Sequence, residues 1–277
     1  MQDEAGNYRS SLQDFYKISE IAISISNNTH GREVDSWKLE YGSYTFTKIC
    51  LHSMSLRAIL PSMKPDGGNK PGIEFWDISS IASLIRSIID TYYAFYYLSV
   101  DNRSDEEDIL RQLIWDYHGE MQRLDLLKKI KSSNPAVKEL KNYTEILKEK
   151  IEQNDNFKNL NTNQKKNIVE GKRALLLTNS EMSERAGIDS YYYKANFNSL
   201  SAYTHAHPFA INQLSNFRAG NDEALNLINS KLETCTGYIC HAVNDMVKLF
   251  PDQKTKIDHI TYELIEKWIY IFKNFNS

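Results

Sequence analysis

The chain has 277 residues, of which 41% are hydrophobic and 25% are charged, a balance typical of a folded globular protein. Its formal net charge is −3, so no overall basic excess points to nucleic-acid binding. With only 11 Gly and 6 Pro, the chain lacks the turn residues that an all-β protein of this length requires. These values favour long helices joined by short connections.

Apolar residues recur at helical spacing along most of the chain. The pattern predicts an all-α helical bundle, organised as one large domain over residues 1–277. In chain order the expected helices cover residues 10–26, 44–60, 77–99, 104–131, 134–152, 180–186, 190–205, 222–249 and 253–275. The third begins at the N-cap Asp77, and almost no polar face remains on it. We therefore expect it to be the central buried helix.

Two segments interrupt the helical pattern. Residues 61–72 hold three prolines and three glycines, which predicts a loop. Residues 153–166 are polar and rich in Asn and Lys, which predicts a mobile segment and the best place for a subdomain division.

The chain shows no sign of export or of membrane insertion. Its first residues, Met1-Gln2-Asp3-Glu4, form neither a basic nor an apolar leader. The most apolar stretch, residues 78–100, contains Arg86 and Asp90 and falls short of a membrane span. The three cysteines have no metal-type pairing. We expect a cytoplasmic protein with no membrane contact, no metal and no cofactor.

The fourth expected helix carries Arg111 and His118, seven positions apart. Seven residues leave an offset of only about 20°, so the two side chains share one helix face. A histidine that titrates near neutrality can move a proton, and a fixed guanidinium can stabilise charge on a phosphate. The pair therefore fits phosphodiester chemistry. Two structural residues on a boundary face of the helix fit the same spacing.

Arg86 and Asp90 lie one turn apart in the third expected helix, beside its apolar face. An ion pair within the helix is one explanation, but Arg preceding Asp is the less favourable order. A polar cluster that reaches to another helix is the alternative, because charges beside an apolar face need partners.

Ser201 and His205 are four residues apart and face the same way at the end of the helix expected over residues 190–205. A serine nucleophile would also need an orienting acid and an oxyanion site, and neither is identifiable. A polar helix end, where His interacts with the helix dipole, is the favoured reading.

Three segments together resemble an uncharacterised family of bacterial all-helical proteins: residues 83–90, residues 107–127, and Leu200-Ser201 with His205. The Arg111-to-His118 element is similar to the signature of HEPN domains. Many HEPN members are metal-independent ribonucleases of toxin–antitoxin, CRISPR and phage-defence systems that act as dimers. This resemblance implies a homodimer in which Arg111 and His118 are the catalytic pair. The HEPN arginine is typically followed by Asn, Asp or His, whereas this chain has Gln112.

Two hypotheses follow. The first is a HEPN-like, metal-independent ribonuclease, such as a toxin or defence effector, with RNA as substrate and an antitoxin as protein partner. Arg111 would stabilise phosphate charge and His118 would transfer a proton, supported by a polar cluster of Arg86, Asp90, Ser201 and His205. The second is a non-catalytic helical module that binds a protein partner or a small ligand. A shared, solvent-reachable cleft at Arg111 and His118 favours the enzyme, and burial with every donor paired favours the module.

Overall fold

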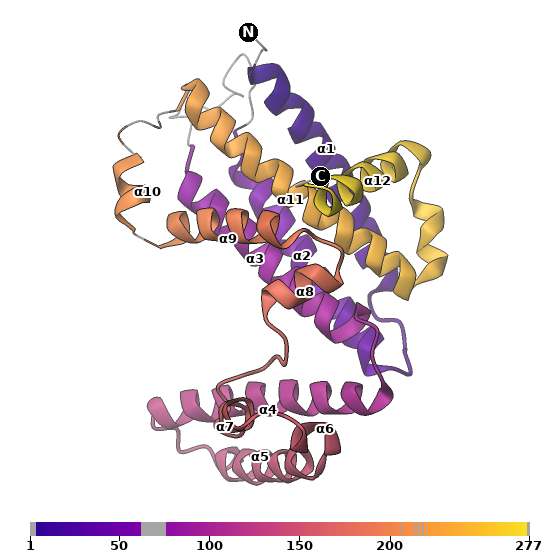
Figure 1. The fold of residues 1–277 in the computed structure, drawn as a ribbon, viewed down its shortest axis with the longest axis vertical. Coiled ribbons are helices and arrows are strands. Elements are labelled where there is room, and N and C mark those ends of the chain that lie inside the picture. The colour runs from indigo at the N-terminus through magenta and orange to yellow at the C-terminus, as the bar shows by residue number, and fades with distance from the viewer. Residues whose placement is uncertain are drawn as a thin grey trace. The chain divides into compact units, whose positions relative to one another are not determined.

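The computed structural model describes residues 4–61, 76–205, 207–213, 215, 217 and 219–275. Within these ranges the chain is helical and forms no strand, which confirms the all-α prediction (Figure 1). The elements in chain order are α1 (Glu4–Thr29), α2 (Trp37–Ile59), α3 (Ile78–Phe95), the π-helical turn η1 (Tyr96–Val100), α4 (Asp105–Lys129), α5 (Ala136–Gln153), α6 (Asp155–Lys158), α7 (Thr162–Val169), α8 (Asn179–Arg185), α9 (Ser190–Thr204), α10 (Pro208–Gln213), α11 (Asp222–Leu249), the 3-10 helix η2 (Pro251–Lys256) and α12 (His259–Lys273).

Capping side chains explain where the observed helices depart from the expected ones. The hydroxyl of Ser36 accepts a hydrogen bond from the Lys38 backbone N–H, so α2 begins well before the expected residue 44. The single helix expected over 253–275 is instead η2 followed by α12, because Asp258 caps a new helix there. The short helix α10 was not expected from the sequence.

The polar segment 153–166, expected to be mobile, folds largely into the short helices α6 and α7. Its asparagines serve as caps: Asn154 begins α6, and Asn161 forms a capping box with Gln164 at α7. Phe157 is buried within the segment. The asparagine-rich composition therefore reflects helix starts. The loop expected over residues 61–72 lies outside the described residues, apart from Pro61.

Contacts between residues divide the chain into two compact units. Unit 1 comprises Met1–Val100 and Asn179–Ser277, and unit 2 is the continuous segment Asp101–Thr178. The division falls at these two junctions and not within residues 153–166. The single domain expected from the sequence stays a prediction.

Unit 1 is built around α3 and α11, which pack against each other. Helix α1 lies along α11, α2 and α9 pack on α3, and α12 packs on α11 (Figure 1). The side chains of α3 that face these neighbours are buried, which confirms the expected central helix. Gly237 lets α12 approach α11 closely, because a Cβ atom there would collide with the ring of Phe272.

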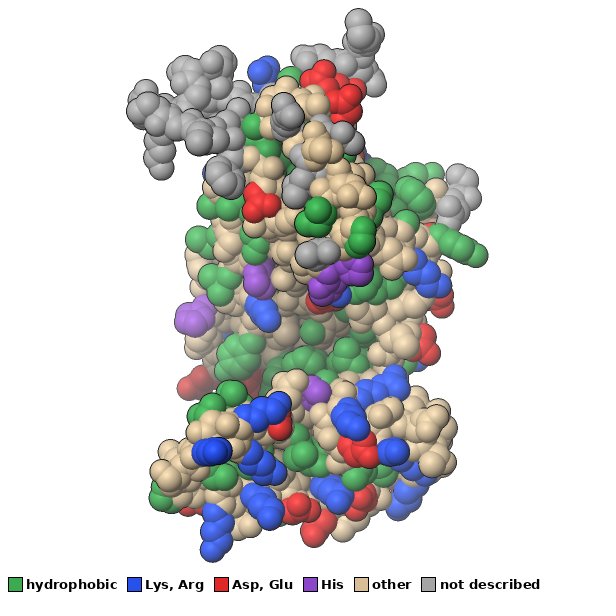
Figure 2. All heavy atoms as spheres, turned by 90° about the vertical axis from the view of Figure 1, so that its left-hand side faces the viewer, with side chains coloured by type: hydrophobic (Ala, Val, Ile, Leu, Met, Phe, Trp, Pro, Cys, Tyr) green, Lys and Arg blue, Asp and Glu red, His purple; other side chains and the backbone are tan. Residues whose placement is uncertain are grey.

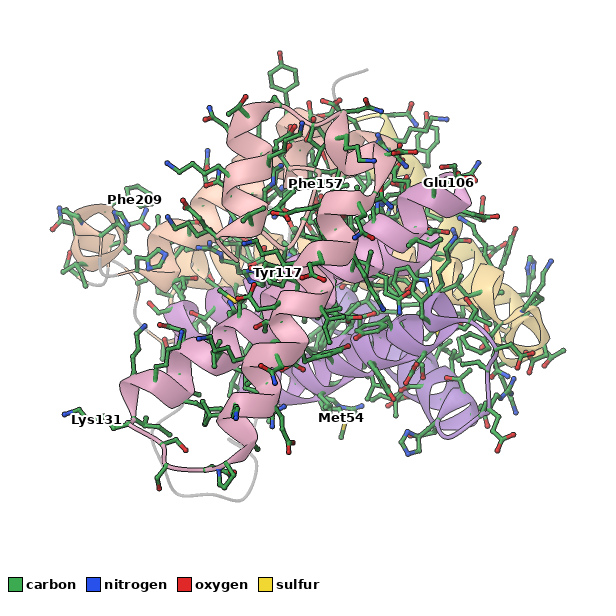
Figure 3. The ribbon with its side chains drawn as sticks, turned by 90° about the horizontal axis from the view of Figure 1, so that it is seen from below. Met54, Glu106, Tyr117, Lys131, Phe157 and Phe209 are labelled. Atoms are coloured by element: carbon green, nitrogen blue, oxygen red, sulfur yellow. The ribbon has the colours of Figure 1, made fainter. Side chains whose placement is uncertain are left out.

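Unit 2 pairs α4 with α5 and adds α6 and α7. Its apolar core consists of Leu110, Ile114, Tyr117, Leu147, Ile151, Phe157 and Ile168. Tyr117 lies midway along α4, between Glu106 in its first turn and Lys131, which follows its C-terminal end (Figure 3). Its hydroxyl donates to the Val169 carbonyl at 2.7 Å, which ties the end of α7 to α4.

Lys and Arg side chains are prominent on one face of unit 2, with Asp and Glu among them (Figure 2). Residues 101–178 hold 15 Lys and Arg against 14 Asp and Glu, so unit 2 as a whole carries almost no net charge. No helix of the described residues is long and apolar enough to cross a membrane.

Candidate functional site

Arg111 is fully buried and its guanidinium contacts two carboxylates of unit 2. Its Nη2 donates to Oδ2 of Asp101 at 2.8 Å, and its Nε donates to Oε1 of Glu107 at 2.9 Å. Glu107 lies one turn before Arg111 on α4, and Asp101 precedes the Ser104 cap of that helix. The local fold therefore directs the guanidinium toward acids of its own unit.

A second buried pair adjoins the first. Arg103 pairs with Asp108, and its Nη1 donates to the backbone carbonyl of Asp101 at 3.0 Å. Burial and the neighbouring positive charge of Arg111 lower the pKa of Arg103. Asp101, Arg103, Glu107, Asp108 and Arg111 thus form one network of interlinked charges, which we call the α4 ion network.

His118 is half-buried on α4, and its Nδ1 atom is buried without a hydrogen-bond partner among the described residues. It follows Arg111 by seven residues, a rise of about 10 Å along the helix. The two side chains predicted to form a catalytic pair therefore stand two turns apart, and Arg111 is held by Asp101 and Glu107.

The structure brings three of the four predicted supporting residues together within unit 1. Arg86 on α3 lies 3.7 Å from Asp90 (Nε to Oδ2) and 3.5 Å from His205 (Nη1 to Nε2). The guanidinium also stacks on the Phe197 ring, 4.6 Å from its centroid. Ser201 is turned away to its own helix, because its hydroxyl donates to the Phe197 carbonyl.

Asp90 completes this polar cluster. Its Oδ1 lies 3.5 Å from Nδ2 of Asn179, the first residue of α8. Burial raises the pKa of the Asp90 carboxyl, and the Arg86 charge opposes that rise. Side chains of α8 and α9 therefore reach the Arg86–Asp90 pair of α3, Asn179 at Asp90 and His205 at Arg86.

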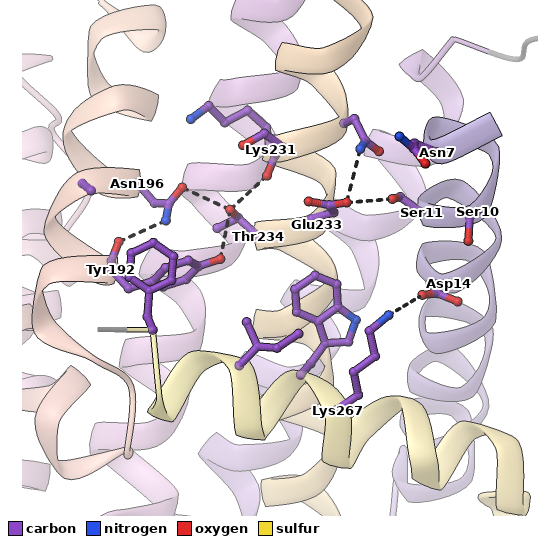
Figure 4. A pocket seen from close by; sticks show the side chains of 16 residues that line it. Asn7, Ser10, Ser11, Asp14, Tyr192, Asn196, Lys231, Glu233, Thr234 and Lys267 are labelled. Carbon is purple, nitrogen blue, oxygen red and sulfur yellow. Dashed lines mark hydrogen bonds and ion pairs between the residues drawn. The ribbon is translucent and has the colours of Figure 1, made fainter. Parts of the chain in front are cut away.

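A third site, which sequence reasoning missed, is a cleft of about 760 Å³ in unit 1. Its walls are α1, α9, α11 and α12 together with Phe275 (Figure 4). Hydroxyl, amide and charged side chains alternate there with the aromatic rings of Tyr192, Trp268 and Phe275.

Hydrogen bonds between the helices fix the polar walls of the cleft (Figure 4). Glu233 on α11 accepts from Ser11 at 3.1 Å and from Asn229 at 3.2 Å. The next residue of α11, Thr234, lies 3.1 Å from the Asn196 amide oxygen and 3.3 Å from the Tyr192 hydroxyl, both on α9. These contacts join α1 and α9 to α11, so the polar side chains are held in place before any ligand arrives.

Three polar groups of the cleft lack a protein partner within the part of the chain that the structure describes. The Asn229 amide oxygen and the Trp268 indole N–H are buried without a hydrogen bond. Lys231 is only 6% exposed and forms no ion pair there, and burial lowers the pKa of its ammonium group. Leaving such groups unpaired costs about 1–3 kcal/mol each, and more for a charge. Their occurrence among the residues of one cleft makes it a candidate ligand site.

The chain matches the model of a family described as a family of unknown function (DUF5677) over residues 70–224. This match spans more than half of the chain. The protein belongs to the DUF5677 family. No curated protein and no solved structure matches the chain.

The α4 ion network and the Arg86 cluster lie inside the segment matched to DUF5677. The cleft draws only α9 from that segment, since α1 and α12 lie outside it and α11 begins near its end. Across the described residues, no group of three His, Cys, Asp or Glu side chains is arranged to hold a metal ion.

Proposed function

We propose that this DUF5677 protein is a helical module that binds a small polar ligand in the cleft of unit 1. The observation that carries the proposal is the presence in the cleft of polar side chains without protein partners among the described residues, chiefly Lys231, which is 6% exposed and forms no ion pair there. A ligand that pairs with them would recover the free energy that their burial costs.

The size and lining of the cleft support this proposal. Its volume of about 760 Å³ falls within the range of small-molecule sites, roughly 300–1,000 Å³. Aromatic rings offer apolar contact area, and side chains held by interhelical hydrogen bonds offer directional contacts. The cleft lies within a single compact unit.

The ribonuclease hypothesis with Arg111 and His118 as the catalytic pair requires the Arg111 guanidinium to reach a substrate phosphate. Arg111 is instead buried and donates to Asp101 and Glu107. Releasing it would strand both carboxylates, so this arrangement favours a structural role for Arg111 and the binding module for the protein.

The module is tested by filling the cleft. Ala195 on α9 lines it, and Ala195→Trp would place an indole inside. We expect wild-type protein to show backbone amide shifts at cleft residues by NMR when titrated with small aromatic amides such as phenylacetamide, and Ala195→Trp to lose them. Ala136→Trp, at an exposed position of α5, is the matched control. Shifts that persist in Ala195→Trp, or that map outside the cleft, would contradict the proposal.

One observation favours a second candidate, RNA cleavage at the Arg86 cluster. Arg86 and His205 approach to 3.5 Å, so a proton-transfer group lies beside a phosphate-stabilising group. Under this candidate, Arg86→Ala and His205→Ala abolish cleavage of structured RNA in EDTA, whereas His118→Ala leaves it intact. Equal cleavage by all three variants, or none by the wild type, rejects it.

A further inference from the structure

Lys231 stands out among the charged side chains of the cleft. Lys267 pairs with Asp14 at 3.5 Å, and Glu233 accepts two hydrogen bonds. Both acids of the cleft are therefore engaged elsewhere. Lys231, on α11, is 6% exposed and has no anionic partner within the described ranges.

A largely buried lysine without a counter-charge is costly, because desolvation disfavours its charged form. Burial is the sole cause that lowers the pKa of Lys231, so no neighbouring carboxylate offsets it. A purely structural lysine at this position would be replaceable by an apolar residue at no loss. An anionic group of a ligand supplies the missing partner.

Resting on the proposed ligand-binding function, we propose that the ligand of the cleft is a small oxyanion, a carboxylate or a phosphate monoester, whose charge pairs with Lys231. The rest of the ligand lies against the aromatic walls, where Tyr192, Trp268 and Phe275 offer ring surface.

Matched pairs of probes and of variants test this pairing. Phenylacetate, phenylacetamide and phenyl phosphate share a ring and differ in charge. Lys231→Met removes the unpaired charge at similar length. Lys129→Met removes an exposed lysine that pairs with Asp125 on α4, outside the cleft, and is the matched control.

By isothermal titration calorimetry on the full chain, we expect at least one of the two anions to bind wild type about tenfold or more tightly than the amide, since ion-paired hydrogen bonds are worth about 1.5–3 kcal/mol. Lys231→Met is expected to bind phenylacetate and phenylacetamide equally, and Lys129→Met is expected to keep the preference for the anion. The stronger of the two anions distinguishes a carboxylate ligand from a phosphate ester. Without ligand, Lys231→Met is expected to melt at a higher temperature than wild type, because the desolvation cost is gone.

The outcomes separate this inference from the proposed function. One outcome is that phenylacetamide binds wild type, that Ala195→Trp abolishes this binding, and that neither anion binds more tightly. This outcome would overturn the inference that the ligand is an oxyanion, and the binding module would stand. A preference that survives Lys231→Met would also overturn the role of Lys231. If none of the three probes binds wild type by calorimetry, the inferred ligand class is rejected. If phenylacetamide also causes no NMR shifts at cleft residues, the binding module is rejected with it.

Discussion

The α4 ion network of unit 2 and the cleft of unit 1 treat buried charge in opposite ways. In the network, Arg111 meets Asp101 and Glu107, and Arg103 meets Asp108. In the cleft, Lys231 meets no acid among the described residues. Buried charges that pair with one another have a structural role, whereas a buried charge without a partner in the protein can pair with a ligand. The comparison directs the search for function away from Arg111 and toward Lys231.

The largest expected effect is that of Arg111→Met. Removing the guanidinium takes a charged partner from Asp101, whose side chain is 5% exposed, and breaking a buried pair in this way costs about 3–5 kcal/mol. Urea unfolding followed by circular dichroism measures the loss. Arg123→Met is the control, because the Arg123 side chain is 65% exposed. A loss in Arg111→Met as small as that in the control would mean that the network does not stabilise the fold.

Gly237→Ala is expected to destabilise unit 1 by about 1–3 kcal/mol through overpacking. The added methyl group would overlap the ring of Phe272, which also packs against Tyr192 and Tyr238. Because α12 supplies Trp268 to the cleft, the displaced helix should also weaken probe binding. Thermal melting and calorimetry measure both effects. Gly119→Ala, where nothing lies near the added atom, is the control and is expected to keep full stability and binding.

His241, which lies outside the cleft, is expected to make the free energy of unfolding depend on pH. Burial lowers the pKa of His241 to about 3 from 6.5, and its Nε2 has no partner among the described residues. Between these pKa values the unfolded chain binds a proton that the folded chain excludes. The free energy of unfolding therefore falls as the pH drops from about 6.5 toward 3.

His241→Leu is expected to remove this pH dependence. The difference in the free energy of unfolding between the variant and wild type should favour the variant by about 2 kcal/mol more at about pH 5 than at pH 8. Urea unfolding at the two pH values measures the change. A wild-type-to-variant difference that is equal at both would show that His241 is protonated in the folded protein.

The cleft should also show a pH dependence of probe binding. Burial lowers the pKa of Lys231, and a bound oxyanion restores the charged form. Above that lowered pKa, binding takes up a proton, so the affinity for phenylacetate should fall by up to tenfold per pH unit as pH rises.

Calorimetry from about neutral pH to pH 10 measures this fall, and buffers of different ionisation enthalpy report the proton taken up. Asp14, Tyr192, Glu233 and Lys267 also line the cleft and remain in Lys231→Met. Any residual binding by that variant should therefore show a flat profile over this range. A flat wild-type profile would contradict the proposed pairing.

Local sequence signals predicted the helices well, and their ends less well. The range of α11 agrees with its pattern of apolar residues, and Asp77 and Ser104 cap the helices as expected. Composition predicts a mobile stretch over residues 153–166 because it does not distinguish an asparagine that caps a helix from one in a loop.

The sites were harder to predict, because they depend on contacts between distant residues. The approach of His205 to Arg86 joins α3 to the end of α9, and only the expectation of a cluster reaching another helix pointed to it. The cleft left one weak signal: Lys231 precedes the buried Tyr238 by seven residues, so a lysine occupies a buried face of α11. Helix spacing also aligned Arg111 with His118, but it says nothing of the acids that hold Arg111.

The discontinuity of unit 1 has a consequence for biosynthesis. Unit 2 is complete once residue 178 has been made, whereas α1 packs chiefly against α11, which ends at Leu249. At about 5–20 residues per second, the ribosome needs roughly 10–40 s to pass from the end of α1 to the end of α11. During that interval Phe15, Ile18 and Ile25 lack their main covering helix. The nascent chain should therefore carry a finished inserted unit and an open amphipathic helix, which is a substrate for chaperones until α11 emerges.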